Sequence, residues 1–571
     1  MELELNPVSS VSLLLLALSA AYVYYTTRIQ SPQRLPPSPP GWPVIGHLHL
    51  LSDMPHHAMA ELSRAMKAPL LRLRLGSVPA VVISKPDLAR AALTSHDAAL
   101  ASRPRLLSGQ FLSFGCSDVT FAPAGAYHRM ARRVVVSELL SARRVATYGA
   151  VRVEELRRLL AHLTKNASPA RPLDLSECLL NLANDVLCRV AFGRRFQHGK
   201  GDRLGAVLAE AVDLFAGFSV GDFFPELEPV ASTVTGLRRR LKRCLADLRE
   251  VCDEIVDEHI SGNRTRIPGD RDEDFVDVLL RVQKSPDLEV PLTDDNLKAL
   301  VLDMFVAGTD TTVSTLEWVM AELVLHPRIL KKAQEEVRRV VGGKGRVEES
   351  DLGELHYMRA VIKETFRLHP AVPLLVPRES VAPCTLGGYD IPARTRVFIN
   401  TFAMGRDPEI WEDPLEYSPE RFENGGGEID LKDPDYRMLP FGGGRRRCPG
   451  YTFALATVQV SLASLLYHFE WGLPAGVRPE DVNLDESFGL STRKKEPLFV
   501  VVNKSEGYEF KGVEVTEALA EEDIGPESEE IAPEDVIDPL LFVDDSDPLL
   551  SVADGMVPDP HEVAVDSVVL D

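Results

Sequence analysis

Hydrophobic and polar residues follow a helical period over most of the chain. Between Val151 and Leu280 apolar residues recur every three to four positions, with three breaks at stretches rich in Pro and Gly. A more continuously apolar run from Thr293 to His326 predicts a long buried helix, and the run from Tyr451 to His468 predicts another. The pattern therefore predicts a mainly α-helical protein.

Strand-like patterns are short and confined to a few places. Leu70–Gly76 alternates Leu with Arg, and Ala80–Ser84 is rich in Val and Ile. Two more short strands are expected at Thr385–Ile391 and Arg396–Asn400, after the proline-rich run Pro370–Pro377. These segments predict a small β-rich lobe beside the helices.

The first residues of the chain contain one uncharged run. Val8–Tyr25 is about 18 residues long and apolar or small throughout, which is the minimum for a membrane-spanning helix. Arg28 and Arg34 follow this run, whereas only Glu2 and Glu4 precede it. This charge order favours an uncleaved anchor, with the rest of the chain in the cytosol, over a cleaved signal peptide.

Composition divides the chain into four expected parts. Residues 1–30 form the anchor, and 31–46 form a stiff hinge because stacked prolines exclude helix. Residues 47–512 form one large domain. Residues 513–571 contain 19 acidic residues and no Lys or Arg, which accounts for most of the net charge of −22. We expect this tail to be disordered and without a catalytic role; a docking segment, an activation-like stretch and an extended reading frame remain alternatives.

Two bulk properties narrow the class of protein. The acidic net charge argues against nucleic acid as a partner. The seven cysteines are odd in number and spread along the chain, so they do not indicate a disulfide framework and favour a reducing compartment.

The strongest chemical motif is Phe441-Gly-Gly-Gly-Arg-Arg-Arg-Cys-Pro-Gly450. Its glycines let the backbone approach a flat, bulky group and leave amide N–H groups free to point at the sulfur of Cys448. Arg446 and its neighbours supply positive charge that favours the thiolate, and the helix that begins at Tyr451 would direct its positive end at the sulfur. A thiolate held in this way is a soft metal ligand. The alternative is a surface turn with a buried cysteine.

This motif, F-x-x-G-x-R-x-C-x-G, resembles the haem-binding loop of the cytochrome P-450 family. In that family the cysteine is the axial ligand of the haem iron, and its thiolate favours cleavage of the O–O bond. The resemblance implies that Cys448 binds the iron of a haem b, and that Phe441, Gly444, Arg446 and Gly450 shape the loop around it.

A second motif, Asp303-Met-Phe-Val-Ala-Gly-Thr-Asp-Thr-Thr312, lies within the long apolar helix. Gly308 and the adjacent threonines favour helix weakly, and their hydroxyls can enter the i→i−4 hydrogen-bond ladder. A packing seam of small residues is the alternative. Together with the cysteine loop, the motif resembles the oxygen-activating groove A-G-x-D-T-T. This implies that Thr311 hydrogen-bonds dioxygen and that Asp310 relays protons.

A third motif, E-x-x-R, is formed by Glu364 and Arg367. Alone it has little meaning, because exposed pairs at this spacing are common and weak. Its place in the chain resembles that of the family's buried Glu–Arg–Arg lock, for which Arg421 would supply the second arginine. Such a triad would stabilise the fold on the cysteine side of the haem.

A fourth segment is a helix that begins at Tyr127 and carries cations three and four residues apart. A solvated basic face is the alternative. The resemblance implies that this helix faces the reductase and holds the haem propionates through Arg132. His128 stands where the family usually has Trp, and we expect it to be a further propionate donor.

Taken together, the four motifs imply a cytochrome P-450 fold, mainly α with a small β-rich lobe and one N-terminal membrane-anchor helix. The proline-rich hinge and the A-G-T-D-T-T groove resemble the plant A-type clan. Residues 108–152 and 488–500 resemble plant enzymes that hydroxylate the indole ring of a small amine. The expected activity is monooxygenation with dioxygen and electrons from NADPH-cytochrome P-450 reductase, on the cytosolic side of the endoplasmic reticulum membrane, where the anchor contacts lipid.

Two alternatives to this activity stay open. One is the same chemistry on another plant metabolite, such as a terpenoid, a flavonoid or an oxime. The other is a haem-thiolate lyase or isomerase that needs neither dioxygen nor reductase, or a haem-binding sensor. The presence of both Asp310 and Thr311 argues against the second alternative.

Candidate substrate contacts come from the same resemblance, and core packing is an equal alternative for the apolar ones. Asp303 is a candidate acceptor for a substrate ammonium, because it lies two helical turns, about 10 Å, from Asp310. Asp118 and Asp222 compete for this role, and Asp303 could instead only cap neighbouring structure. The apolar candidates are Phe114, Phe215, Leu374, Leu375 and Phe488.

Overall fold

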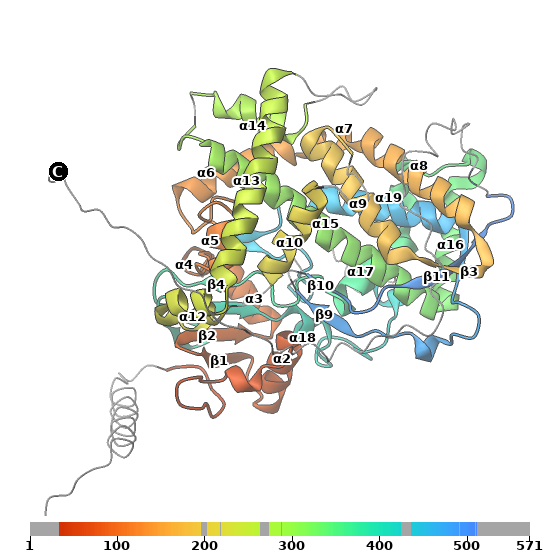
Figure 1. Ribbon diagram of the computed structural model, residues 1–571. Coiled ribbons are helices and arrows are strands. Elements are labelled where there is room, and N and C mark those ends of the chain that lie inside the picture. The colour runs from red at the N-terminus through yellow and green to blue at the C-terminus, as the bar shows by residue number, and fades with distance from the viewer. Residues whose placement is uncertain are drawn as a thin grey trace, which may run out of the picture. The chain divides into compact units, whose positions relative to one another are not determined.

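The structure is a computed structural model that describes residues 34–195, 203–216, 219–262, 273–286, 288–423, 436–489, 491–508 and 510. The expected anchor at 8–25 and the acidic tail at 513–571 lie outside these residues. Within the described ranges, no helix is both long and apolar enough to cross a membrane. Figure 1 shows a mainly helical body with a few short strands, as the periodicity predicts.

Helix α15 (Asp294–Leu325) is the central element and matches the predicted helix. Thr293 caps its first turn through a hydrogen bond from the backbone N–H of Asn296, and the Asn296 side chain returns the contact. Almost all of its side chains are buried, which explains the absence of an apolar stripe in the sequence. At Gly308 a Cβ atom would meet Leu187 of helix α9 at 3.0 Å, so glycine allows the two helices to pack closely.

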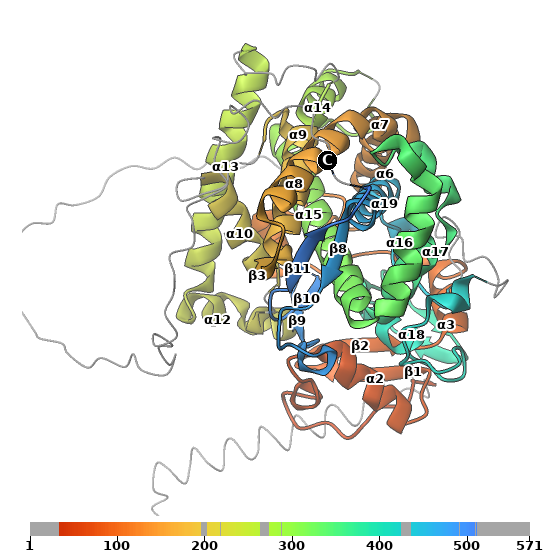
Figure 2. The ribbon, with the colours of Figure 1, turned by 90° about the vertical axis from the view of Figure 1, so that its right-hand side faces the viewer.

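Helices α9, α14, α16, α17 and α19 pack against α15, whereas α2 and α18 lie beside the strands (Figures 1 and 2). Helix α19 has the bounds predicted for it, Tyr451–His468. Helix α6 is followed directly by a π-helical turn at Val135–Leu139. The α-helices are α2 (Pro55–Ala65), α3 (Pro86–Leu93), α4 (Asp97–Leu100), α5 (Leu107–Leu112), α6 (Ala126–Val134), α7 (Ala142–Thr147), α8 (Gly149–Asn166), α9 (Leu175–Phe192), α10 (Arg203–Ala216), α11 (Val220–Phe223), α12 (Glu228–Val234), α13 (Leu237–Ser261), α14 (Phe275–Gln283), α15, α16 (Pro327–Val341), α17 (His356–Leu368), α18 (Thr401–Gly405) and α19.

The strands form small sheets at the edge of the helical body (Figure 2). One sheet has the order β1-β2-β7-β4, a second has the order β3-β11-β8, and two hairpins are β5–β6 and β9–β10. The bounds are β1 (Leu70–Leu75), β2 (Val78–Ile83), β3 (Ser168–Asp174), β4 (Arg378–Glu379), β5 (Cys384–Leu386), β6 (Tyr389–Ile391), β7 (Arg396–Ile399), β8 (Phe469–Gly472), β9 (Glu486–Phe488), β10 (Thr492–Lys494) and β11 (Phe499–Lys504).

The predicted strands are present, with one correction. β1 and β2 pair antiparallel, and β7 joins β2 in parallel to form the expected β-rich lobe. The segment expected as one strand at 385–391 is instead the hairpin β5–β6. Gly387 and Gly388 both have positive φ, at 58° and 82°, and this backbone geometry turns the chain back on itself.

Two observations concern the interior. One large hydrophobic cluster extends through the helices around α15, and smaller clusters pack against both faces of the four-stranded sheet. All seven cysteines are free thiols, so the fold depends on packing and polar contacts and not on disulfides.

Candidate active site

The loop that precedes α19 holds Cys448. The backbone N–H of Cys448 donates to the carbonyl of Phe441 at 2.9 Å and closes the loop. Gly444 has a φ of +64°, and a Cβ atom there would lie 2.5 Å from Oδ1 of Asp97 and 2.6 Å from the carbonyl oxygen of Leu93. Only glycine fits this position, so the fixed glycine of the motif has a steric cause.

Burial raises the pKa of the Cys448 thiol. The backbone N–H of Gly450 and the positive charges of Arg132 and Arg447 oppose this rise without cancelling it. The N–H of Gly450 belongs to the start of α19, as the sequence predicts. The expectation that Arg446 and its neighbours favour the thiolate holds for Arg447, whose charge lowers this pKa together with that of Arg132, whereas Arg446 itself does not contribute.

Arg446 supports a different part of the site. Its guanidinium donates to the carbonyl oxygens of Ala101, Val119 and Ala122 at 2.7, 3.1 and 2.5 Å. It therefore connects the cysteine loop to Ala101, which follows α4, and to the loop between α5 and α6. Burial lowers the pKa of Arg446 to about 10, so its side chain remains a cation at neutral pH.

Several cations converge near the cysteine. Arg132 donates to the carbonyl of Arg447 at 2.7 Å, and Arg378 donates to Asp97 at 2.8 Å and to the carbonyl of Gly443 at 2.7 Å. Arg378 was not predicted; the proline run just before it was the only sequence signal. It adds a second buried arginine to Arg446, beside the half-buried Arg132.

His128 lies within this group of arginines. Burial and the charges of Arg446 and Arg132 lower its pKa to about 3, so the ring is neutral at physiological pH. Its Nε2 is buried and has no hydrogen-bond partner among the described residues. Buried arginines beside an unpaired imidazole nitrogen suit an anionic group, and the two propionates of haem have that chemistry. The residues present therefore fit a haem held by Cys448.

A cavity extends from Cys448 along one face of α15. Ala307, Gly308 and Thr311 line its α15 side, and apolar residues form most of the remainder. These include Leu112, Phe121, Leu187, Phe215, Val306, Phe366, Ala371, Val372, Leu375, Val376 and Phe441. An apolar cavity with few polar groups suits a small, mostly apolar substrate.

The threonines of α15 are bonded as the sequence predicts. The hydroxyl of Thr311 donates to the carbonyl of Ala307 at 2.8 Å, and Thr312 donates to Gly308 at 2.7 Å. Because each hydroxyl gives its proton to the helix, the oxygen of Thr311 can accept a hydrogen bond on the cavity side. Asp310 also lines the cavity. Its carboxylate forms an ion pair with Arg493 and accepts a hydrogen bond from the Ser491 hydroxyl.

Of the six candidate substrate contacts, Phe215, Leu375 and Asp303 line the cavity. The other three lie outside its lining. Phe114 packs beneath Arg249, whose Cζ lies 4.8 Å from the ring centroid; Leu374 belongs to the sheet core; and Phe488 stacks on His56, with 5.6 Å between the ring centroids.

Phe121 lines the cavity and was not predicted. Its ring is stacked on Phe215, with 5.3 Å between the centroids and 6° between the planes. The two residues are far apart in the sequence, and no local pattern around Phe121 indicates this contact. The pair gives the cavity an aromatic wall.

Asp303 binds the adjacent loop with both carboxylate oxygens. It accepts the backbone N–H groups of Val119 at 3.0 Å and Thr120 at 3.2 Å, and the Thr120 hydroxyl at 2.6 Å. This geometry corresponds to the alternative in which Asp303 caps neighbouring structure. The two competing acids bind backbone as well: Asp118 accepts from Phe121, and Asp222 accepts from Leu107 and Ser219.

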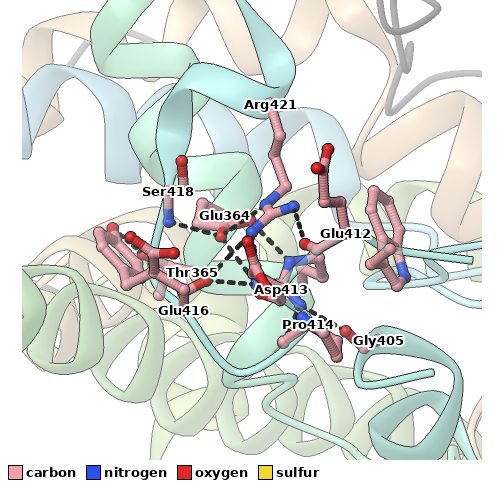
Figure 3. Close-up of polar contacts among 12 residues, drawn as sticks. Glu364, Thr365, Gly405, Glu412, Asp413, Pro414, Glu416, Ser418 and Arg421 are labelled. Atoms are coloured by element: carbon pink, nitrogen blue, oxygen red, sulfur yellow. Dashed lines mark hydrogen bonds and ion pairs between the residues drawn. The ribbon is translucent and has the colours of Figure 1, made fainter. Parts of the chain in front are cut away.

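The Glu–Arg–Arg triad joins α17 to Arg421 of the segment Pro419–Phe422 (Figure 3). Glu364 accepts from Arg367 at 2.7 and 2.8 Å and from Arg421 at 2.9 Å. The side chains of Glu364 and Arg367 are fully buried. Arg367 also donates to the carbonyls of Gly405, Pro414 and Glu416, so this ion pair fixes the chain between α17 and the cysteine loop.

The fold and the site together define a haem-thiolate protein. The family model described as Cytochrome P450 matches residues 36–500. The chain therefore belongs to the cytochrome P450 family, whose members are monooxygenases that use haem. In fold it resembles a solved structure of zebrafish cytochrome P450 with abiraterone. That structure has a TM-score of 0.65 at 24% identity, over 79% of this chain and all of the other.

Among curated proteins, the chain is 86% identical to tryptamine 5-hydroxylase of Oryza sativa subsp. japonica, over 90% of this chain and 100% of the relative. It is 40% identical to strychnine-11-hydroxylase of Strychnos nux-vomica, over 82% of this chain and 91% of the relative. It is also 40% identical to desmethyl-deoxy-podophyllotoxin synthase of Sinopodophyllum hexandrum, over 88% of this chain and 97% of the relative.

Proposed function

We propose that this protein hydroxylates tryptamine at C5 of the indole ring and so produces serotonin. The observation that carries the proposal is the 86% identity to tryptamine 5-hydroxylase along the full length of that relative. Dioxygen is the oxygen source, and NADPH-cytochrome P-450 reductase supplies the electrons. The family and the haem site are compatible with other substrates, so the similarity to this relative is what selects tryptamine.

In this proposal each part of the site has a separate task. Cys448 holds the haem iron, while Arg132, Arg378, Arg446 and His128 hold the propionates. The haem, when bound, supplies the reductive activation of dioxygen. The Gly450 N–H and Arg132 favour the thiolate, against burial, which raises the pKa of the thiol.

The substrate end of the cavity orients the indole. Phe121 and Phe215 offer a flat aromatic wall against which the ring can pack, and Leu375 and Val376 line another part of the cavity. Apolar walls exclude water, which favours transfer of oxygen to the ring over release of reduced oxygen into solvent.

Proton movement is assigned to the polar pair on α15. Thr311 lines the cavity. Its hydroxyl donates to the carbonyl of Ala307, so the hydroxyl oxygen remains available as an acceptor. Asp310 takes up protons and passes them toward Thr311, after which it returns to its ionised state. Both residues line the same cavity as Cys448.

We also propose that residues 8–25 anchor the chain in the endoplasmic reticulum membrane, followed by the hinge at 31–46, the catalytic domain at 47–512 in the cytosol and a non-catalytic tail at 513–571. The uncharged run and the arginines after it support this arrangement.

Microsomes that contain the full chain and the reductase test the proposed activity. Fed with tryptamine and NADPH, they are expected to produce serotonin, identified by mass and retention time, and Cys448→Ser microsomes are expected to produce none. Turnover of a terpenoid, flavonoid or oxime panel without turnover of tryptamine would overturn the substrate assignment. Turnover without NADPH would indicate a lyase or isomerase.

A further inference from the structure

Two histidines and one glutamate join α2 to β9. The Nε2 atoms of His56 and His57 each lie 2.8 Å from Oε2 of Glu486. The histidines are consecutive in the first turn of α2, and the glutamate is the first residue of β9, 430 positions after His56. None of these three described residues lines the cavity that contains Cys448. The group is therefore separate from the haem site.

The three polar atoms of this group are placed as metal ligands are. The two Nε2 atoms and Oε2 all lie within 4.8 Å of one another. Two imidazoles and one carboxylate form a ligand set that Zn²⁺ takes in proteins, with water as the fourth ligand. Zinc–ligand distances of about 2.0–2.2 Å place the atoms around one tetrahedral ion about 3.3–3.6 Å apart. The present contacts of 2.8 Å therefore need only a small expansion to accept the ion.

The members of the group differ in their access to water. The side chain of His56 is fully buried and that of Glu486 is 9% exposed, whereas that of His57 is 42% exposed. The buried ring is held by aromatic neighbours, because it packs edge-on against Phe402 at 4.9 Å and stacks on Phe488 at 5.6 Å between centroids. Two ligands are thus fixed in the interior, and an ion with its water ligand can enter from the side of His57.

A histidine binds a metal through a ring nitrogen that carries no proton. Burial lowers the pKa of His56, so its ring is neutral at neutral pH. Its Nδ1 is buried and has no hydrogen-bond partner among the described residues, so no recorded contact fixes which ring nitrogen carries the proton. The ring can therefore hold its proton on Nδ1 and present a lone pair at Nε2, without losing a proton overall.

We propose that His56, His57 and Glu486 bind a zinc ion, and that water completes its coordination. The ion replaces the two hydrogen bonds to Glu486 and fastens α2 to β9, so its role is structural and separate from the proposed function. Two features limit its affinity. The Nδ1–H of His56 gains no acceptor, and the positive charge of Arg406, whose Cζ lies 3.8 Å from the ring centroid of Phe402, acts on the same group.

Equilibrium dialysis of the haem-loaded full chain against buffered Zn²⁺ tests the proposal, with bound zinc per haem measured by mass spectrometry. The wild type is expected to bind zinc at this site. In His57→Gln the amide can still donate to Glu486, so the variant keeps a hydrogen-bonded bridge but loses a ligand. Its zinc affinity is expected to fall by at least about 10–100-fold, and that of Glu486→Gln by a similar factor. His49→Gln, at an exposed histidine before α2, is the matched control and is expected to bind as the wild type does.

A second group of possible ligands among the described residues is His259, Asp274 and Asp277. There Asp274 already accepts the backbone N–H of Asp277 at 2.9 Å and caps α14, so we expect Asp277→Asn to leave zinc binding unchanged. Zinc affinity that falls in Asp277→Asn and not in His57→Gln would overturn the proposal. No zinc binding by the wild type, or equal affinity in the wild type and His57→Gln, would show that the three side chains form a hydrogen-bonded bridge only.

X-ray absorption at the zinc edge gives a readout that needs no variant, and it decides the matter if His57→Gln and Glu486→Gln fail to load haem. The wild type is expected to show imidazole nitrogen at about 2.0–2.1 Å and oxygen ligands, without sulfur. Sulfur at about 2.3 Å would place the ion at a cysteine and overturn the proposal. Both measurements are independent of the substrate, so a failure of tryptamine turnover would leave their results unaffected.

Discussion

The carboxylate of Asp303 holds Thr120 twice, through its backbone N–H at 3.2 Å and its hydroxyl at 2.6 Å. This contact joins the central helix to the loop that carries Phe121, one of the two stacked aromatic rings of the cavity. The acid that the sequence offered as a candidate acceptor for a substrate ammonium is therefore already used to hold the cavity wall.

Asp303→Asn is expected to destabilise the haem-loaded protein by about 1–3 kcal/mol, because the amide NH₂ opposes the N–H groups of the loop and leaves one unpaired. Thermal unfolding measures this loss. Spectral titrations should show similar losses of affinity for tryptamine and for neutral indole. A loss of about 10-fold or more for tryptamine alone would instead identify Asp303 as the counter-ion of the amine.

Cys448→Ser is expected to remove the thiolate ligand. An alcohol is a poor ligand for this iron, so haem is lost or the carbon-monoxide band moves away from the thiolate position. The carbon-monoxide difference spectrum of the reduced protein measures this. Cys384→Ser, on strand β5 and remote from the motif, is expected to keep the wild-type band. An unchanged spectrum in Cys448→Ser would contradict the assignment of the ligand.

Thr311→Ala is expected to uncouple NADPH oxidation from hydroxylation. Positioned proton transfer contributes about 10²–10⁴-fold, so without the hydroxyl more reduced oxygen leaves as peroxide. The ratios of product and peroxide to NADPH measure the effect. Thr311→Ser retains a hydroxyl and is expected to preserve most of the coupling. Equal coupling in the alanine variant and the wild type would show that another group supplies the proton.

Glu364→Gln is expected to cost about 3–5 kcal/mol of stability, because it leaves the buried guanidinium of Arg367 without its carboxylate. Chemical unfolding and the fraction of protein that retains haem measure this loss. Glu423→Gln breaks a surface ion pair with Lys332 and is the control, with an expected cost of about 0–1 kcal/mol. Similar stabilities for the two variants would argue against a stabilising role for the triad.

Glu322 gives the protein a defined sensitivity to acid. Burial alone would raise the pKa of its carboxyl, but contacts with His326 and His369 outweigh burial and lower the pKa to about 2. A carboxyl whose pKa is depressed in the folded state stabilises it above the unfolded pKa of about 4.5, and this contribution is lost as the pH falls toward 2.

Glu322→Gln is therefore expected to lose about 3 kcal/mol at neutral pH and to show a shallower decline in stability between about pH 4.5 and pH 2. Unfolding free energies across this interval measure the slope. Glu335→Gln, on the exposed face of α16, is expected to follow the wild-type slope. A variant slope equal to that of the wild type would show that the two histidine contacts do not stabilise the carboxylate.

The sequence alone determined the features that depend on neighbouring residues. The ten residues around Cys448 identify the haem-thiolate loop, because a ligand, its glycines and the following helix are contiguous there. The sequence pattern located α15 and α19, since a helix buried on all sides requires a long, nearly continuous apolar run. Glu364 and Arg367 are one turn apart, so their pairing could also be inferred from spacing.

Only the tertiary structure decided the contacts between distant segments. Arg378 reaches the cysteine loop, Phe121 stacks on Phe215, and Arg493 pairs with Asp310, yet no local pattern marks any of these residues. It also placed Arg446 on the carbonyls of Ala101, Val119 and Ala122, and Asp303 on the backbone N–H groups of residues 119 and 120. Side chains of the same charge can bind a cofactor, a substrate or the backbone, and the choice depends on which partners the fold brings within hydrogen-bonding distance.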